Sequence, residues 1–149
     1  IASGQLFPSG EAELRSEVIP TVEQIALLIK DSRITRLQED IQFRPFVQAI
    51  EKSNRNLSME IRTEGHTDNI PLPLELKSKW KSNWELSTAR ALNIVELISK
   101  FSELGQEKFS AMGYGEFRPL NNNNSFEGRS QNRRVEIYID AFVTSNKMK

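Results

Sequence analysis

The chain has 149 residues, with 20 Lys and Arg against 20 Asp and Glu, one His and no Cys. This length predicts one domain that buries its own core, and the absent net charge argues against broad electrostatic binding to nucleic acid or an anionic membrane surface. The lack of cysteine excludes disulfides, zinc–thiolate sites and thiol nucleophiles. The longest apolar run, residues 25–29, is far shorter than a membrane span. Because the chain begins at Ile1 without a signal-peptide pattern, we expect a fragment whose upstream part held an anchor or a signal.

The first third of the chain predicts a short strand and two helical segments. Residues 4–10 favour a strand that ends in a turn. Residues 11–31 carry apolar side chains at helical spacing, and Pro20 within them predicts a kink or a late start. Residues 34–54 end in a helix that Pro45 could begin, whereas their first half is a strand or a loop. We interpret residues 31–56 as a helix-containing insertion.

The remainder predicts strand, helix, strand, polar loop and strand. Apolar and polar side chains alternate over residues 57–65, which is typical of a half-buried strand. After a loop at 66–82, apolar residues recur at helical spacing up to Phe101, with either Ser82 or Ser87 as the N-cap and Gly105 marking the end. Residues 108–115 and 133–143 favour two more strands, separated by a polar loop with room for one helical turn. Residues 144–149 are expected to be a flexible tail.

This order of elements predicts the fold class. Strands alternate with helices, and no internal repeat is present. We therefore expect a single domain over residues 1–149, an α/β (α+β) sandwich in which one sheet packs against two or three helices.

The stretch "EGHTDNIPL", residues 64–72, contains the only histidine of the chain. In a strand, His66 and Asp68 would share a face. A metal ion there would need carboxylates from distant parts of the chain, so we predict no metal site, and nothing in the sequence indicates a cofactor. A serine nucleophile with a base in reach is not indicated either. We interpret His66 as a structural residue whose ring bonds a backbone group at the strand end.

Two charged residues are better candidates for binding. Asp68 is either a turn residue that bonds its own backbone or an exposed carboxylate that receives a cation. If Ser87 is the N-cap, Arg90 lies in the first helical turn, where a cation is unfavourable unless an anion binds there. The alternative is a solvated arginine, or one paired with Asp68 or Glu85. Asp68 and Arg90 together would suit a zwitterion such as an amino acid.

Two further sets of residues have a structural and a functional interpretation. Trp80 and Trp84 either pack against the helix, which we favour, or form a wall of a site. The basic residues Arg129, Arg133 and Arg134 are interpreted as a solvated strand edge, because the neutral total charge disfavours nucleic-acid binding.

Four segments in order, "GHTDNIPL", "SNWELSTARA", "GYGEFRP" and "RSQNRRVEIYI", resemble the OmpA-like peptidoglycan-binding domain. The resemblance implies a βαβαβ-type fold with one mixed sheet, and a ligand that is the peptide stem of peptidoglycan, often its diaminopimelate residue. It also implies roles for five residues. Asp68 would receive the ligand ammonium and Arg90 its carboxylate. Thr67 and Asn83 would support the site, and Arg133 would contact the ligand or its carboxylate region.

Within that family, residues 65–72 and 82–91 look most like the stator B subunits of the flagellar motor (MotB). This likeness implies a non-enzymatic wall anchor in the periplasm, tethered to the inner membrane by an N-terminal segment. The implied partners are peptidoglycan, a second copy of the chain and the A-type membrane subunit of the stator. One alternative is a wall tether of the outer membrane, a lipoprotein or a porin tail, that uses the same site. Another is a peptidoglycan hydrolase that acts through His66.

Overall fold

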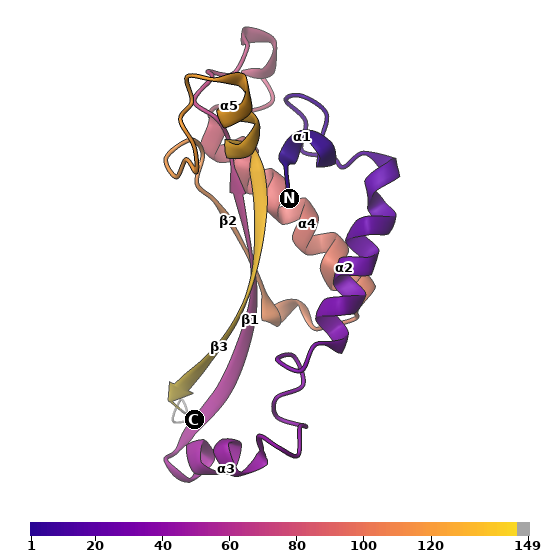
Figure 1. Cartoon of the computed structure of the whole chain (residues 1–149), viewed down its shortest axis with the longest axis vertical. Helices are drawn as coiled ribbons and strands as arrows, with labels where there is room; N and C mark the ends of the chain where they lie inside the picture. Colours follow the sequence, from indigo (N-terminus) through magenta and orange to yellow (C-terminus); the bar gives the residue numbers. More distant parts are fainter. Residues whose placement is uncertain (146–149) are drawn as a thin grey trace.

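The computed structural model describes residues 1–145, which form a three-stranded mixed sheet covered on one face by helices (Figure 1). The strand order is β2-β1-β3. Helix α4 packs on β1 and β2, and α2 packs on α4. This confirms the expected fold class of one mixed sheet with packed helices. No helix among the described residues has the length and apolar character needed to cross a membrane.

The central strand is β1 (Arg55–His66). It runs parallel to β2 (Phe109–Gly113), with Ile61 opposite Phe109, and antiparallel to β3 (Arg134–Ser145) over its whole length. The strand period of two sends alternate side chains to opposite faces. Ile61 and Thr63 are thereby buried beneath the helices, whereas Glu64 and His66 project from the outer face.

The last strand is longer than the sequence predicts. Thr144 and Ser145 pair with Asn56 and Arg55, so the expectation of a flexible tail from residue 144 is wrong for these two residues. The other four residues of that expected tail lie outside the described part of the chain.

The N-terminal segment is not the expected strand. Residues Ser3–Leu6 form one helical turn, α1. Before it, Ala2 lies opposite Arg134 of β3, and Ile1 exchanges two backbone hydrogen bonds with Val135. The reason lies in two consecutive apolar residues. Leu6 and Phe7 are both almost fully buried, at 2% and 1% exposure, and a strand would send such neighbours to opposite faces.

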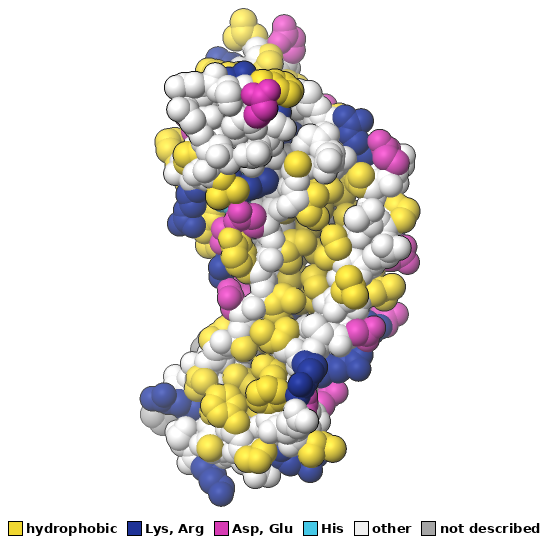
Figure 2. Space-filling model, viewed as in Figure 1, with side chains coloured by type: hydrophobic (Ala, Val, Ile, Leu, Met, Phe, Trp, Pro, Cys, Tyr) yellow, Lys and Arg dark blue, Asp and Glu magenta, His cyan; other side chains and the backbone are white. Residues whose placement is uncertain are grey.

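Helix α2 (Ile19–Asp31) starts late, as one of the two predictions for Pro20 required, because the proline occupies its first turn. The short 3-10 turn η1 (Ser16–Val18) precedes it. Val22, Ala26 and Ile29 of α2 are buried with Ile94 and Ile98 of α4 in the main core. Figure 2 shows hydrophobic side chains gathered along the middle of this face, between the sheet and α2.

The segment of residues 31–56 lies at the end of the molecule opposite α5 (Figure 1). Its helix, α3 (Arg44–Lys52), begins beside Pro45 as predicted. Its first half forms turns rather than a strand. Arg55 and Asn56 already belong to β1, so only residues 31–54 lie outside the sheet. Whether the segment is an insertion in the family fold stays a prediction.

Helix α4 (Asn83–Ser102) begins at Ser82, whose hydroxyl accepts a hydrogen bond from the Glu85 amide at 3.4 Å. The alternative cap, Ser87, is wrong because its hydroxyl instead donates to the Trp84 carbonyl within the helix. The helix stops before Gly105, with Glu103 in the left-handed conformation at φ 57°. Because Arg90 therefore lies beyond the first turn, the helix-dipole reason for placing an anion beside it is also wrong.

Two glycines let α4 approach the sheet closely at the carboxyl ends of the parallel strands. A Cβ at Gly65 would lie 2.0 Å from the Ser87 carbonyl oxygen, and one at Gly113 would lie 2.1 Å from the Thr88 hydroxyl. The loops that follow β1 and β2 therefore emerge against the first turns of α4. These loops contain η2 (Leu74–Leu76) and α5 (Phe126–Asn132), and η3 (Gln106–Lys108) leads into β2.

Candidate ligand-binding site

A cavity of about 520 Å³ lies where β1 ends. The N-terminal segment, the loop after β1, the start of α4 and the region of α5 enclose it. All five residues that the sequence predicts for ligand binding line this cavity: Thr67, Asp68, Asn83, Arg90 and Arg133. Their roles toward a ligand stay predictions, but the structure brings them together.

Asp68 combines the two interpretations that the sequence left open. Its Oδ1 accepts a hydrogen bond from the Ile70 amide at 3.0 Å, as in a turn, and its Oδ2 accepts one from Arg133 Nη1 at 2.5 Å. The carboxylate therefore does receive a cation, supplied by the protein itself. It is buried, at 8% exposure, so the expectation of an exposed carboxylate is wrong.

Arg90 is a buried cation without an ion pair among the described residues. Its Nε donates to the Glu11 carbonyl at 2.8 Å, and its guanidinium lies 5.1 Å from the centre of the Phe7 ring. Only 5% of the residue is exposed. Burial, and secondly the charge of Arg133, lower the pKa of Arg90 to about 10, so it is still charged at neutral pH. Arg90 is therefore neither a solvated arginine nor one that is paired with Asp68 or Glu85.

Thr67 and Asn83 hold the loops that shape the cavity. The Thr67 amide donates to the Gly115 carbonyl at 2.8 Å, while its buried hydroxyl has no hydrogen-bond partner among the described residues. The Asn83 amide group donates to the Ile70 carbonyl at 3.2 Å and to Glu116 Oε2 at 3.1 Å. Asn83 thus links the start of α4 to the loops after both parallel strands.

The three arginines that the sequence groups as a solvated strand edge are separated in the structure. Arg133 and Arg129 line the cavity, and Arg129 donates to the Asn123 carbonyl at 2.8 Å. Arg134 is instead buried and bonds Glu136 on the outer face of the sheet at 2.7 Å. Phe7 and Arg15 are among the lining residues for which the sequence predicts no site role. Four arginines thus line the cavity, and Asp68 is its only lining carboxylate among residues 1–145, which favours an anionic group in the ligand.

The tryptophans do not line the cavity. Trp80 is half-buried and donates to the Gly10 carbonyl at 2.8 Å, while its packing against the helix stays a prediction. Trp84 is 47% exposed and stacks on Phe117 with ring centres 5.4 Å apart.

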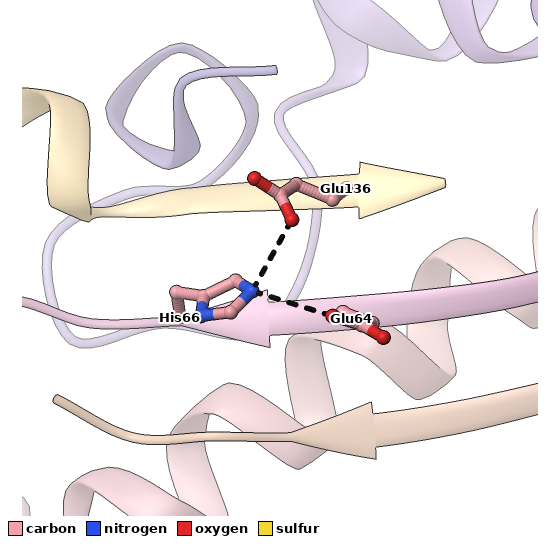
Figure 3. Close-up of side chains that lie close together, drawn as sticks. All are labelled: Glu64, His66 and Glu136. Carbon is pink, nitrogen blue, oxygen red and sulfur yellow. Dashed lines mark ion pairs between the residues drawn. The ribbon is translucent and has the colours of Figure 1, made fainter. Parts of the chain in front are cut away.

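His66 lies on the other side of the sheet from the cavity's helices, and its predicted bond to a backbone group is wrong. The ring is 2% exposed, stacks on Tyr114 at 5.3 Å and has no hydrogen bond at either nitrogen among the described residues. Its Nε2 lies 3.9 Å from Glu64 Oε2 and 3.7 Å from Glu136 Oε2 (Figure 3). Burial, and then the charge of Arg134, lower the pKa of the His66 imidazole despite these carboxylates.

The chain belongs to the OmpA family, whose model matches residues 33–133. This range includes most of the segment that the sequence predicts to be an insertion. The chain is also 35% identical over 133 residues to Motility protein B of Bacillus subtilis (strain 168). That similarity covers 89% of this chain and 41% of the relative, so the chain spans less than half of that protein's length.

Two solved structures share the fold. The cell wall anchor of the T6SS from Pseudomonas aeruginosa is 31% identical, with a TM-score of 0.63 over 92% of this chain and 76% of that one. The periplasmic domain of Helicobacter pylori MotB is 24% identical, with a TM-score of 0.66 over 93% of this chain and 78% of that one. The predicted likeness to MotB within the OmpA family is thereby confirmed.

Proposed function

We propose that this domain binds the peptide stem of peptidoglycan non-covalently through the cavity at the end of β1, and that it thereby anchors a flagellar motor stator to the cell wall. The similarity to a motility protein B and to a cell wall anchor supports this function. The observation that carries it is Arg90, a buried guanidinium that lines the cavity without a carboxylate partner among residues 1–145.

A zwitterionic amino-acid end suits the charges of the cavity. Arg90 has two terminal nitrogens left for a ligand carboxylate, since its bond to Glu11 uses Nε alone. Asp68 has bonds from the Ile70 amide and Arg133, and a carboxylate with about four acceptor positions can still accept from a ligand ammonium. The Arg133 side chain is 30% exposed, so it can also reach a ligand carboxylate. Diaminopimelate in a stem peptide carries both kinds of group.

The same relatives support a wider proposed role. We place the domain in the periplasm, joined through an upstream segment to the inner membrane and to an A-type stator subunit, and acting as a pair. The proposed anchoring involves no catalysis, and the one histidine is buried on the outer face of the sheet and does not line the cavity. An outer-membrane tether would use the same cavity. The upstream sequence distinguishes the two, since a single hydrophobic span with an acidic residue indicates a stator.

The test is calorimetric titration of a diaminopimelate stem peptide against the domain and two variants. Asp68→Asn keeps the shape and removes the charge. Because a hydrogen bond to a charged group contributes about 1.5–3 kcal/mol, we expect roughly one to two decades of lost affinity. Asp31→Asn removes the same charge from the end of α2, where the side chain is 69% exposed, and should bind as the unaltered domain does. Circular dichroism establishes that both variants fold. Equal affinity in all three proteins would refute the site.

A further inference from the structure

A second cluster of chemically active side chains lies on the outer face of the sheet. This sheet-face cluster consists of Glu64, His66 and Glu136, which offer one nitrogen and two carboxylate oxygens within 4.8 Å of one another. Glu64 and Glu136 are directly opposite each other in the β1–β3 pairing. Like charges in that position repel, so the pair would be stabilised by a cation between them.

Each carboxylate of the cluster is oriented by an arginine that uses only one of its oxygens. Arg62 Nε donates to Glu64 Oε1, and Arg134 Nε donates to Glu136 Oε1, both at 2.7 Å. The other oxygen of each group, Oε2, points toward His66 (Figure 3). The Tyr138 hydroxyl also donates to Glu136 Oε2, at 2.6 Å. Outer partners of this kind commonly fix the direction of metal ligands.

His66 supplies an independent indication, since it is a buried polar side chain aimed into the cluster without a hydrogen-bond partner in the part of the chain that the structure describes. Its Nε2 is too far from either carboxylate for a hydrogen bond, at 3.7 and 3.9 Å. Two ligands that each bind one tetrahedral ion at about 2.1 Å are separated by roughly 3.4 Å. A closure of a few tenths of an ångström would therefore bring the imidazole and each carboxylate to that separation. The two carboxylates lie within 4.8 Å of each other and would have to approach further to share one ion.

We propose that the sheet-face cluster is a binding site for a divalent transition-metal ion, held by His66 Nε2 and one oxygen each of Glu64 and Glu136. An imidazole with two carboxylates suits zinc and its neighbours, whereas magnesium and calcium favour sites built from oxygen alone. Glu136 gives the ion its route, because its side chain is 24% exposed while those of His66 and Glu64 are 1% and 7% exposed. The site is separate from the stem-peptide cavity and does not depend on that function.

The composition of the chain allows an unambiguous test of metal binding. With one histidine and no cysteine, a change in an imidazole signal can come only from His66. We would titrate chelator-treated protein with zinc chloride and follow the His66 ring by NMR and the binding heat by calorimetry. We expect one ion per chain, a shift of the ring signals and a higher Tm in zinc, with no such effects from magnesium.

Two matched variants assign the ligands. Glu136→Gln removes one ligand and should weaken zinc binding at least tenfold, whereas Glu60→Gln removes the same charge from β1 outside the cluster and should leave it unchanged. Circular dichroism serves as the folding control for both. Ring signals that zinc does not move, or equal zinc affinity in the two variants, would overturn the proposal. A His66→Gln variant is not required, because these two outcomes already decide whether the cluster binds zinc.

Discussion

The cavity and the sheet-face cluster both include residues from one stretch of chain, residues 64–68, yet their charged groups differ. Among the described residues, the cavity lining has four arginines and one carboxylate, Asp68. On the outer face, two carboxylates, each paired with an arginine, flank the ring of His66. The separation arises where β1 ends, because the Thr67 amide bonds the Gly115 carbonyl and the strand alternation stops. His66 and Asp68 therefore do not share a face, although their spacing in a strand predicts that they would.

The comparison teaches that the group without an ionic or hydrogen-bonding side-chain partner among the described residues, rather than the type of residue, indicates what each region binds. Both regions contain arginine–carboxylate pairs, Asp68 with Arg133 and Glu136 with Arg134. Within each pair the two charges compensate each other, so the pair says little about the charge of a ligand. The informative group in each region is the one without such a partner in the described chain, the Arg90 guanidinium in the cavity and the His66 imidazole in the cluster.

The largest expected effect comes from Gly65, the residue between the two regions. Gly65→Ala would place a methyl group 2.0 Å from the Ser87 carbonyl oxygen, and backbone cannot rotate away as a side chain can. We expect a loss of about 3 kcal/mol in the free energy of unfolding, the upper end for overpacking. Urea denaturation followed by circular dichroism measures it. Gly4→Ala is the control, since a Cβ there meets nothing within 4 Å. Similar stability of the two variants would contradict the close packing of α4 on β1.

Arg90 gives the next largest effect, on affinity rather than on stability. Arg90→Met fills the same space without charge and should cost roughly one to two decades of stem-peptide affinity. Its stability should stay within about 1 kcal/mol of the unaltered domain, because the desolvation of a buried cation offsets its bond to Glu11. Arg90→Lys should restore only part of the affinity, since it lacks the two-pronged geometry. Calorimetry and urea denaturation measure the two quantities. A large loss of stability with unchanged affinity would make Arg90 a structural residue.

Substitution of His66 should affect stability more than stem-peptide affinity, which is the reverse of the effect expected for Arg90. His66→Gln removes a buried ring that stacks on Tyr114, so we expect a loss of about 1–2 kcal/mol in stability and little change in stem-peptide affinity. Both measurements are made with a chelator present, so that a bound metal does not contribute. Asn124→Ala, at an exposed loop position, serves as the control for stability. A tenfold loss of stem-peptide affinity in a folded His66→Gln domain would contradict the separation of the cavity from the sheet-face cluster.

Much of the fold was accessible from the sequence, because periodicity records which face of an element is buried. The alternation at Leu57, Met59 and Ile61 predicted β1, and the helical stripe through Ala91, Ile94 and Ile98 predicted α4. The N-cap could not be decided by pattern, because Ser82 and Ser87 both precede apolar residues at helical spacing. Only the hydrogen bond from the Glu85 amide distinguishes them.

The sequence predicts which residues line the cavity, but not which contacts these residues make. Motif order identified five lining residues, among them Asp68, Arg90 and Arg133. The pairing of Asp68 with Arg133, 65 positions apart, depends on how the loops after β1 and α5 meet in space. The burial of Arg134 depends likewise on its place opposite His66 across the sheet. No local pattern in the sequence records either arrangement. The sequence therefore could not show that Arg129, Arg133 and Arg134 have separate environments.

Asn83 should give the smallest effect, because it supports the cavity at its rim through neutral or partly exposed contacts. Asn83→Ala removes hydrogen bonds to the Ile70 carbonyl and to Glu116 while leaving the charges of Asp68 and Arg90 in place. Since a hydrogen bond of this kind contributes about 0.5–1.5 kcal/mol, we expect stem-peptide affinity to fall by roughly threefold to tenfold. Calorimetric titration measures the loss, and Asn124→Ala is again the control. If Asn83 instead bonds the ligand itself in a charge-assisted contact, its loss will match that of Asp68→Asn, and the residue will count as a direct ligand contact.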